Sequence, residues 1–296
     1  MQRIFVGDVQ GCADEFEEVL DRARSTFGSD FEIWSVGDLV NRGPDSLRIL
    51  RAMRDLVESG RGRIVLGNHE LALLHVAAGL RELSPRDTMS DILEAPDSRD
   101  WIDWLRAQPL AVIGTLAESG AQSEAADDRS RFAMVHAAVH PDWELSEIER
   151  RARTAEARLS DPDSRAFRQF LAAKEDPDRD VVARLTRCRS VSASGAWSVD
   201  PPDEDSSSFE AWHELWSRRR HRYGVVYGHW ARQGLHVAPG LRGLDTGCVH
   251  HGRGRDGYLT AWLPDPESRD PFAIPDESFW HIRARRAYYA ERLSTV

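Results

Sequence analysis

Five short polar motifs carry the residue types that bind divalent metal ions. GDVQG, GDLVNRG and GNHE fall within the first seventy residues, and HAA and GHW follow later in the chain. Carboxylate, amide and imidazole groups in this combination suit two first-row divalent ions, and a carboxylate can bridge them. The pattern predicts a dimetal hydrolytic site. Its candidate residues are Asp8, Asp38, Asn68, His69, His136 and His229.

Each motif taken alone has an ordinary structural explanation. A Gly-Asp pair after a strand is usually a turn that caps the next helix. A single histidine at the end of a strand, such as His136, is more often a buried imidazole with a hydrogen-bond partner. The combination of all five motifs favours a functional site over five unrelated turns.

The first seventy residues alternate apolar strands with amphipathic helices, and this arrangement positions three of the motifs. Residues 3–6, 31–36 and 63–66 are short apolar runs typical of buried strands. Phe16, Val19, Leu20 and Ala23 recur at helical spacing between the first two runs, and residues 47–57 do nearly the same. A β-α-β-α-β order predicts parallel strands. The motifs that follow them should meet in a crevice at the carboxyl ends of the strands.

The rest of the chain is interpreted as a single domain over residues 1–296 with added segments. Further strands are predicted at 110–116, 131–136, 223–227, 240–244 and 258–263. Further helices are predicted at 71–78, 100–107, 180–189 and 209–220, with a charge-rich helical stretch at 144–174 that Pro162 interrupts. The added segments are a mobile polar loop at 118–130, a variable helical insertion at about 144–180, a flexible loop at about 198–208 and a C-terminal extension at about 264–296.

Composition excludes several classes of protein. The 296 residues are 41% hydrophobic, which is enough for a core, and no apolar run approaches the ~18 residues of a membrane span. The net charge of −10 argues against a sequence-blind binder of nucleic-acid backbone. Three cysteines and the absence of a secretory pattern favour a cytoplasmic protein. Cys12 and Cys248 are interpreted as buried packing residues, with redox sensitivity as the alternative.

The five motifs, in this order, resemble those of the calcineurin-like metallophosphoesterases. Within that superfamily the chain is most similar to the bacterial symmetrical bis(5'-nucleosyl)-tetraphosphatases. The similarity extends to stretches without obvious chemistry, such as LEAPD and WLRAQPL, and to TRCR, GHW and LDTGC. It covers roughly residues 1–143 and 181–263.

The resemblance implies a fold and a set of metal ligands. The implied fold is α/β, a four-layer α/β/β/α sandwich of two mixed sheets flanked by helices. Two divalent ions are implied, with manganese favoured and cobalt or magnesium as alternatives. Asp8 and Gln10 would hold the first ion, Asp38 would bridge both, and Asn68, His136 and His229 would hold the second. Water activated between the ions would be the nucleophile.

The resemblance also implies residues that act on the substrate. Arg42 and Arg187 would clamp phosphate oxygens, since a guanidinium group matches two oxygens at once. His69 would be the general acid near the leaving group, with Asn41 beside it. Arg189, Trp230 and His250 are further candidates for substrate contact. Packing under the site is the alternative for Trp230, and an exposed loop position is the alternative for His250.

Three positions depart from the superfamily pattern. Gln10 replaces a histidine, so the first ion would be held by a poorer donor. Asn41 stands where protein serine/threonine phosphatases carry Asp, and it can orient His69 but supplies no charge. Ala138 stands where glycine is usual. A weakened acid suits an anhydride better than a phosphoserine, because a phosphate anion leaves without much protonation and an alkoxide does not.

The predicted activity is hydrolysis of dinucleoside polyphosphates, chiefly of diadenosine tetraphosphate to two molecules of ADP. Dinucleoside-tetraphosphate caps on RNA 5' ends are a second substrate class with the same chemistry. The alternatives are a protein serine/threonine phosphatase of the same superfamily and a nucleotide-binding sensor with weak catalysis. No membrane association and no protein partner are predicted.

Overall fold

The first seventy residues form the predicted β-α-β-α-β unit. The computed structural model describes residues 1–116, 130–202, 208–268, 270–273 and 278–288. The unit consists of β1 (Gln2–Val6), α1 (Ala13–Phe27), β2 (Phe31–Ser35), α2 (Ser46–Glu58) and β3 (Gly62–Ile64). β1, β2 and β3 are parallel neighbours, so their carboxyl ends share one edge.

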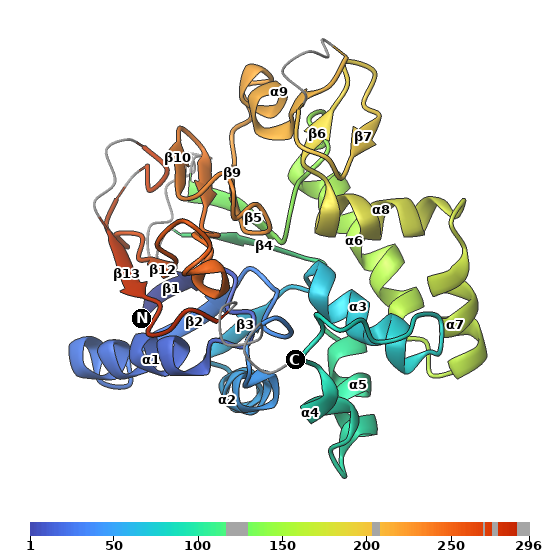
Figure 1. The fold of residues 1–296 in the computed structure, drawn as a ribbon. Helices are drawn as coiled ribbons and strands as arrows, with labels where there is room; N and C mark the ends of the chain where they lie inside the picture. The colour runs from blue at the N-terminus through green and yellow to red at the C-terminus, as the bar shows by residue number, and fades with distance from the viewer. Residues whose placement is uncertain (117–129, 203–207, 269, 274–277, 289–296) are drawn as a thin grey trace.

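Two five-stranded sheets are built around this unit (Figure 1). β12 (Tyr258–Trp262) and β13 (Phe279–Arg283) complete the first sheet in the order β13-β12-β1-β2-β3. The second sheet has the order β10-β11-β9-β5-β4. Its strands are β4 (Ala111–Thr115), β5 (Arg131–Val135), β9 (Gly224–Tyr227), β10 (His236–Ala238) and β11 (Leu241–Gly243). Each sheet contains both parallel and antiparallel pairs, as the family resemblance implies.

Aromatic side chains fill the space between the two sheets. Phe5 of β1 lies 5.5 Å from Trp34, 5.4 Å from Phe132 and 5.3 Å from Trp262, measured between ring centroids. Because neighbouring residues of a strand point to opposite faces, Ile4 packs instead with the helices outside the sheet. The two cores fix how the first sheet sits against the second, and therefore how their strand ends meet.

Helices cover the outer faces of both sheets and complete the four layers. α1 and α2 pack on the first sheet, and α6 (Leu145–Leu159) packs on β4 and β5. The remaining helices are α3 (Asn68–Ala77), α4 (Ser90–Leu93), α5 (Ser98–Arg106), α7 (Ser164–Ala172), α8 (Pro177–Arg187), α9 (Trp212–Arg218) and the 3-10 turn η2 (Cys248–His250). Helices α6 and α7 are separated at Pro162, as the sequence predicts.

Several strands escaped prediction because they are short or lie at a sheet edge. β10 and β13 are edge strands. A small sheet of order β7-β6-β8 joins β6 (Ser190–Val191), β7 (Trp197–Ser198) and β8 (Glu210–Ala211), each too short to show a period. The predicted loop at 118–130 lies outside the described residues except for Ser130, as do residues 203–207 of the predicted loop at 198–208 and residues 289–296 of the C-terminal extension.

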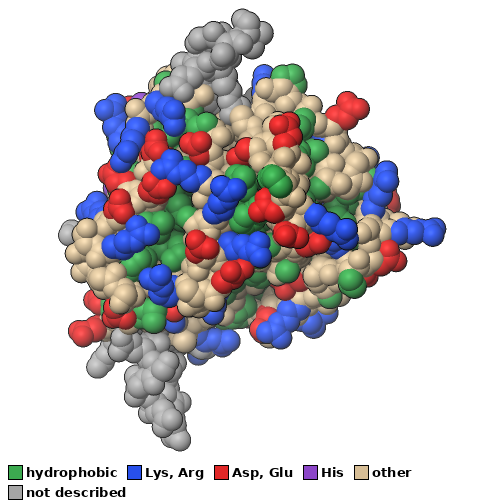
Figure 2. All heavy atoms as spheres, turned by 90° about the horizontal axis from the view of Figure 1, so that it is seen from below, with side chains coloured by type: hydrophobic (Ala, Val, Ile, Leu, Met, Phe, Trp, Pro, Cys, Tyr) green, Lys and Arg blue, Asp and Glu red, His purple; other side chains and the backbone are tan. Residues whose placement is uncertain are grey.

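The outer helices present a surface of mixed charge. Figure 2, seen from below, shows arginine and acidic side chains interspersed on one face. Arg48 of α2 pairs with Asp14 and Glu17 of α1, so part of this charge is neutralised between the two helices. None of the helices in the described parts is long and apolar enough to cross a membrane.

Candidate active site

The predicted site residues meet where strands of both sheets end, and the backbone there is strained. Six non-glycine residues of the described chain have a positive φ, and five of them are predicted site residues. These five are Gln10 (47°), Asp38 (52°), Asn41 (74°), Arg42 (66°) and His229 (70°). Such left-handed conformations cost energy and persist where the surrounding structure holds them, typically at functional sites.

Two motif glycines allow the carboxylates to approach the backbone. A Cβ at Gly67 would lie 2.2 Å from Oδ1 of Asp38, and a Cβ at Gly228 would lie 2.0 Å from Oδ1 of Asp8. Both distances are far inside van der Waals contact. The glycines of GNHE and GHW are therefore required by the position of the acids.

Asp38 lies at the centre of the site and contacts residues from three other loops. Its Oδ1 accepts the backbone N–H of His69 at 2.8 Å and lies 3.4 Å from Nε2 of His136. Its Oδ2 accepts from Nε2 of Gln10 at 3.0 Å and lies 3.7 Å from Nε2 of His69. Burial raises the pKa of Asp38, but His136 and His69 together lower it below its ordinary value. The geometry suits a carboxylate shared between two ions.

His136 and His229 aim unprotonated ring nitrogens at one point. Nδ1 of His136 lies 2.8 Å from the carbonyl oxygen of Val36, and Nε2 of His229 lies 3.1 Å from that of Arg187. A carbonyl only accepts hydrogen bonds, so these two nitrogens carry the protons. Burial lowers the pKa of both histidines, which keeps each ring neutral with a single N–H.

The opposite nitrogens of the two rings then face Oδ1 of Asn68, and Nε2 of His136 also lies 3.4 Å from Oδ1 of Asp38, a carboxylate oxygen that only accepts. Nε2 of His136 lies 3.2 Å and Nδ1 of His229 lies 2.8 Å from Oδ1 of Asn68. Lone pairs facing one another without a proton between them are unfavourable unless a cation lies among them. Metal-ligating histidines commonly donate their other N–H to a backbone carbonyl, as both do here. The residues present therefore fit a divalent ion at Asn68, His136, His229 and Asp38.

The part of the site around Asp8 consists mainly of carboxylates. Asp8, Asp38 and His136 each offer a ligand atom within 4.8 Å of the others. Asp8 accepts the backbone N–H of His229, but burial and the charges of Asp245 and Asp38 raise its pKa well above the ordinary value. Burial raises the pKa of Asp245 to about 6. Buried acids that repel one another in this way are stabilised by a divalent cation. Gln10 directs its amide nitrogen at Asp38, so its oxygen would face an ion only in the reversed orientation.

Asn41 fixes the orientation and the tautomer of His69. Oδ1 of Asn41 accepts the backbone N–H groups of Arg42 at 2.8 Å and Thr88 at 3.0 Å, which assigns the amide. Nδ2 of Asn41 then donates to Nδ1 of His69 at 2.9 Å and to Asp87 at 3.0 Å. His69 therefore carries its proton on Nε2, facing Asp38 and the cavity. Asp87, which accepts a hydrogen bond from Asn41, adds a negative charge next to the Asn41–His69 pair.

A cavity of about 770 Å³ opens over these residues and is rich in arginine. Trp230 and His250, two of the candidates for substrate contact, line it, and burial lowers the pKa of His250 to about 4. Arg42 and Arg189 also line it, whereas Arg187 ends α8 as an exposed side chain and is not among the lining residues. The complete set of lining arginines is Arg42, Arg189, Arg232, Arg253 and Arg255.

Several residues of the site were not identified from the sequence. Asp245 belongs to the LDTGC stretch, where the resemblance drew attention to the motif without giving the acid a role. Glu70 of GNHE accepts the backbone N–H groups of Asp38 (2.9 Å), Leu39 (2.7 Å) and Gly67 (2.8 Å), and so joins two metal-binding loops. Nothing local in the sequence marks Arg232, Arg253 and Arg255.

The fold and the site define a class of protein. The sequence pattern of the calcineurin-like phosphoesterases matches residues 1–245, and the chain belongs to this family. The chain is 37% identical over 261 residues to the symmetrical bis(5'-nucleosyl)-tetraphosphatase of Ralstonia nicotianae, covering 84% of this chain and 86% of the relative. It is 35% identical to the protein of that name from Escherichia coli strain HS, over 85% of this chain and 90% of the relative.

Solved structures agree on the fold. A crystal structure with the provisional name diadenosine tetraphosphatase aligns with a TM-score of 0.58 at 22% identity, covering 96% of this chain and 93% of the other. A serine/threonine phosphatase from Saccharomyces cerevisiae aligns with a TM-score of 0.56 at 14% identity, covering 97% and 80%. These two structures share the architecture and do not by themselves separate the two activities.

Proposed function

We propose that the protein is a cytoplasmic enzyme that hydrolyses dinucleoside tetraphosphates symmetrically, chiefly diadenosine tetraphosphate to two molecules of ADP. The activity depends on two divalent ions. The observation that carries the proposal is the convergence of unprotonated histidine nitrogens and carboxylates below a cavity lined by arginines. Relatives named for this activity at 34–37% identity over most of the chain support it.

The proposed ligands would hold the two ions at adjacent places. Asp8 and Gln10 would hold the first ion, Asp38 would bridge, and Asn68, His136 and His229 would hold the second. Oxygen donors at the first place favour manganese or magnesium over zinc or copper. When bound, the two ions supply a nucleophile at neutral pH by lowering the pKa of water, and they stabilise charge on the attacked phosphate.

The arginines of the cavity orient the phosphate chain. Arg42 and Arg189 flank the candidate metal ligands and offer guanidinium groups that hold two phosphate oxygens each. Arg189 thus takes the role that the resemblance gave to Arg187. Trp230 lies beside them and offers an aromatic face to a nucleotide base. The ring centroid of His213 lies 5.8 Å from that of Trp230.

His69 holds the proton that the leaving phosphate can accept. Burial lowers its pKa, and Asn41 keeps the proton on Nε2. A neutral imidazole is a weak acid, and this is sufficient when the leaving group is a nucleoside diphosphate. The hydrogen bond from Asn41 therefore favours anhydride cleavage over hydrolysis of a phosphoserine.

Product analysis with labelled water tests the proposal. Wild-type protein reconstituted with manganese, cobalt or magnesium should convert diadenosine tetraphosphate to ADP alone, with heavy oxygen from water in one of each two ADP molecules. Asp38→Asn should lose both turnover and bound metal. Asp21→Asn, an exposed acid of α1, is the matched control and should keep both. AMP and ATP as products would refute symmetrical cleavage.

Two other results would replace the proposal. Faster turnover of a phosphopeptide than of the dinucleotide would identify a protein phosphatase, the class of the yeast structure with the same fold. Tight nucleotide binding without turnover in any of the three metals would identify a sensor. RNA bearing a dinucleoside-tetraphosphate cap belongs in the same assay, because its phosphate chain is the same.

A further inference from the structure

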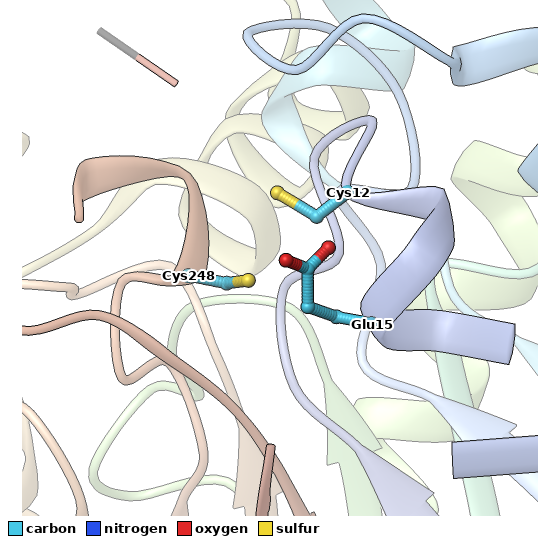
Figure 3. Close-up of side chains that lie close together, drawn as sticks. All are labelled: Cys12, Glu15 and Cys248. Atoms are coloured by element: carbon cyan, nitrogen blue, oxygen red, sulfur yellow. The ribbon is translucent and has the colours of Figure 1, made fainter. Parts of the chain in front are cut away.

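A second cluster of potential ligands lies outside the cavity. Cys12 immediately precedes α1, Glu15 lies in the first turn of α1, and Cys248 begins η2. Their ligand atoms all lie within 4.8 Å of one another. Figure 3 shows the three side chains directed toward one another from α1 and from the turn that faces it. All three are buried, with exposed fractions of 0%, 0% and 1%.

Glu15 is a buried acid whose hydrogen bonds come from neutral donors. Its Oε1 accepts the backbone N–H of Arg285 at 2.6 Å, and its Oε2 accepts the hydroxyl of Tyr288. The side chain of Arg285 pairs instead with Glu18. A buried carboxylate held only by neutral donors is costly unless a positive charge is nearby.

We propose that Cys12, Glu15 and Cys248 bind a thiophilic divalent cation such as Zn²⁺, separate from the ions of the active site. Two sulfur donors and one carboxylate are a ligand set that zinc uses, and the Tyr288 hydroxyl, which donates to Glu15, would have to turn its oxygen toward the ion to serve as the fourth donor. Each thiol loses its proton to solvent on binding, so one cation replaces two protons.

The dimensions of the cluster match such an ion. Zinc–sulfur bonds of about 2.3 Å in a tetrahedron place two sulfurs about 3.8 Å apart, which is within the observed limit of 4.8 Å. The complex would carry one net negative charge.

A cation here would join three segments that are distant in the sequence. Cys12 follows Gln10 by two residues, and Cys248 follows Asp245 by three, so both ligands end loops that line the active site. Tyr288 belongs to the segment after β13. The ion would therefore hold the loops under the candidate first metal and fasten the C-terminal segment to α1.

Cobalt is the probe that separates this site from the catalytic one. Thiolate bonds to Co²⁺ give a strong near-ultraviolet charge-transfer band, whereas the candidate catalytic ligands contain no sulfur. Titrating Co²⁺ into chelator-treated, reduced full-length protein should produce this band, and Zn²⁺ should abolish it. Cys12→Ser and Cys248→Ser should lose the band. Cys188→Ser is the matched control, since Cys188 is also buried but lies at the end of α8, and it should keep the band.

A second measurement needs no variant. Zinc should slow alkylation of Cys12 and Cys248 in the wild-type protein and leave that of Cys188 unchanged, as mass spectrometry of the alkylated peptides would measure. A wild-type protein without the band would overturn the proposal. A band that survives in Cys248→Ser, or equal protection of all three thiols, would also overturn it.

Discussion

Exchanging Asn41 and Asp87, the amide and the acid linked to His69 by hydrogen bonds, tests how His69 is oriented. Nδ2 of Asn41 donates to Asp87 at 3.0 Å and to His69 at 2.9 Å. Asn41→Asp removes both donated hydrogens and places a second carboxylate against Asp87. Asp87→Asn in the same chain restores a donor between the two positions, with the charge now next to His69.

The structure sets the size of the effect. Asn41 is 1% exposed, and the side chain of Asp87 is also 1% exposed, so water does little to screen the pair. Two carboxylates about 4 Å apart repel by about 4 kcal/mol at an effective dielectric constant of about 20. Arg81, which pairs with Asp87, offsets part of this repulsion. We expect Asn41→Asp alone to lower the free energy of unfolding by about 2–4 kcal/mol and the double variant to recover at least half of the loss.

Urea unfolding of the four proteins of the cycle measures the coupling. Work near pH 8 prevents either acid from taking up a proton. Asp55→Asn, an exposed acid of α2, is the control and should change stability by less than about 0.5 kcal/mol. The double variant should also gain activity on an alkyl phosphate relative to the dinucleotide, because a carboxylate beside His69 stabilises the protonated ring. Independent, additive effects of the two substitutions would refute the reasoning.

Three further predictions follow from the site. His69→Asn should slow an alkyl phosphate monoester by about 10²–10⁴-fold and the dinucleotide much less, and equal losses in steady-state rates would contradict the leaving-group argument. Gln10→His should raise the apparent metal affinity when activity is titrated back into chelator-treated protein, and coincident curves would remove Gln10 from the ligands. Burial and His236 lower the pKa of His213 to about 3, whereas the unfolded residue titrates near 6.5. His213 should therefore contribute a loss of stability as the pH drops below about 6.5, of up to about 1.4 kcal/mol per pH unit, and urea unfolding of His213→Gln should show a shallower slope by that amount while the other buried histidines keep theirs.

Local patterns in the sequence predicted most of the longer strands and helices. The apolar runs and the helical spacing of Phe16, Val19 and Leu20 predicted β1, α1 and β2 close to their observed bounds, because each depends on residues near one another in the chain. The prediction of two mixed sheets with outer helices came from the family resemblance, and the strand order confirms it. The two-residue strands of the small sheet have no period to detect, and β13 is an edge strand held by its pairing with β12 and its packing on α1.

The candidate metal ligands could be predicted because each one lies in the loop or helix start that follows a strand, within a few residues of the strand's end. Asp8, Asp38 and Asn68 come after parallel neighbours, so the covalent order alone brings them to one edge. Their proposed roles remain predictions that the experiments above test. The resemblance could not tell which arginine faces the cavity, because Arg187 and Arg189 differ by two residues at the end of a helix and only the packing orients them.

The sequence by itself determined which chemical groups this chain carries, in what order, and which strand or helix each group ends or begins. Only the tertiary structure decided which groups meet. Asp87 supports Asn41 because the segment between α3 and α4 lies against the loop between β2 and α2, whereas Asp245 contacts Asp8 and Cys248 faces Cys12 because β11 and the turns after it pack against the first sheet. These pairs are separated by between 46 and 237 residues, and no periodicity in a sequence extends over such distances. The position of one sheet on the other, fixed by the aromatic core around Phe5, brings together the pairs Asp8–Asp245 and Cys12–Cys248.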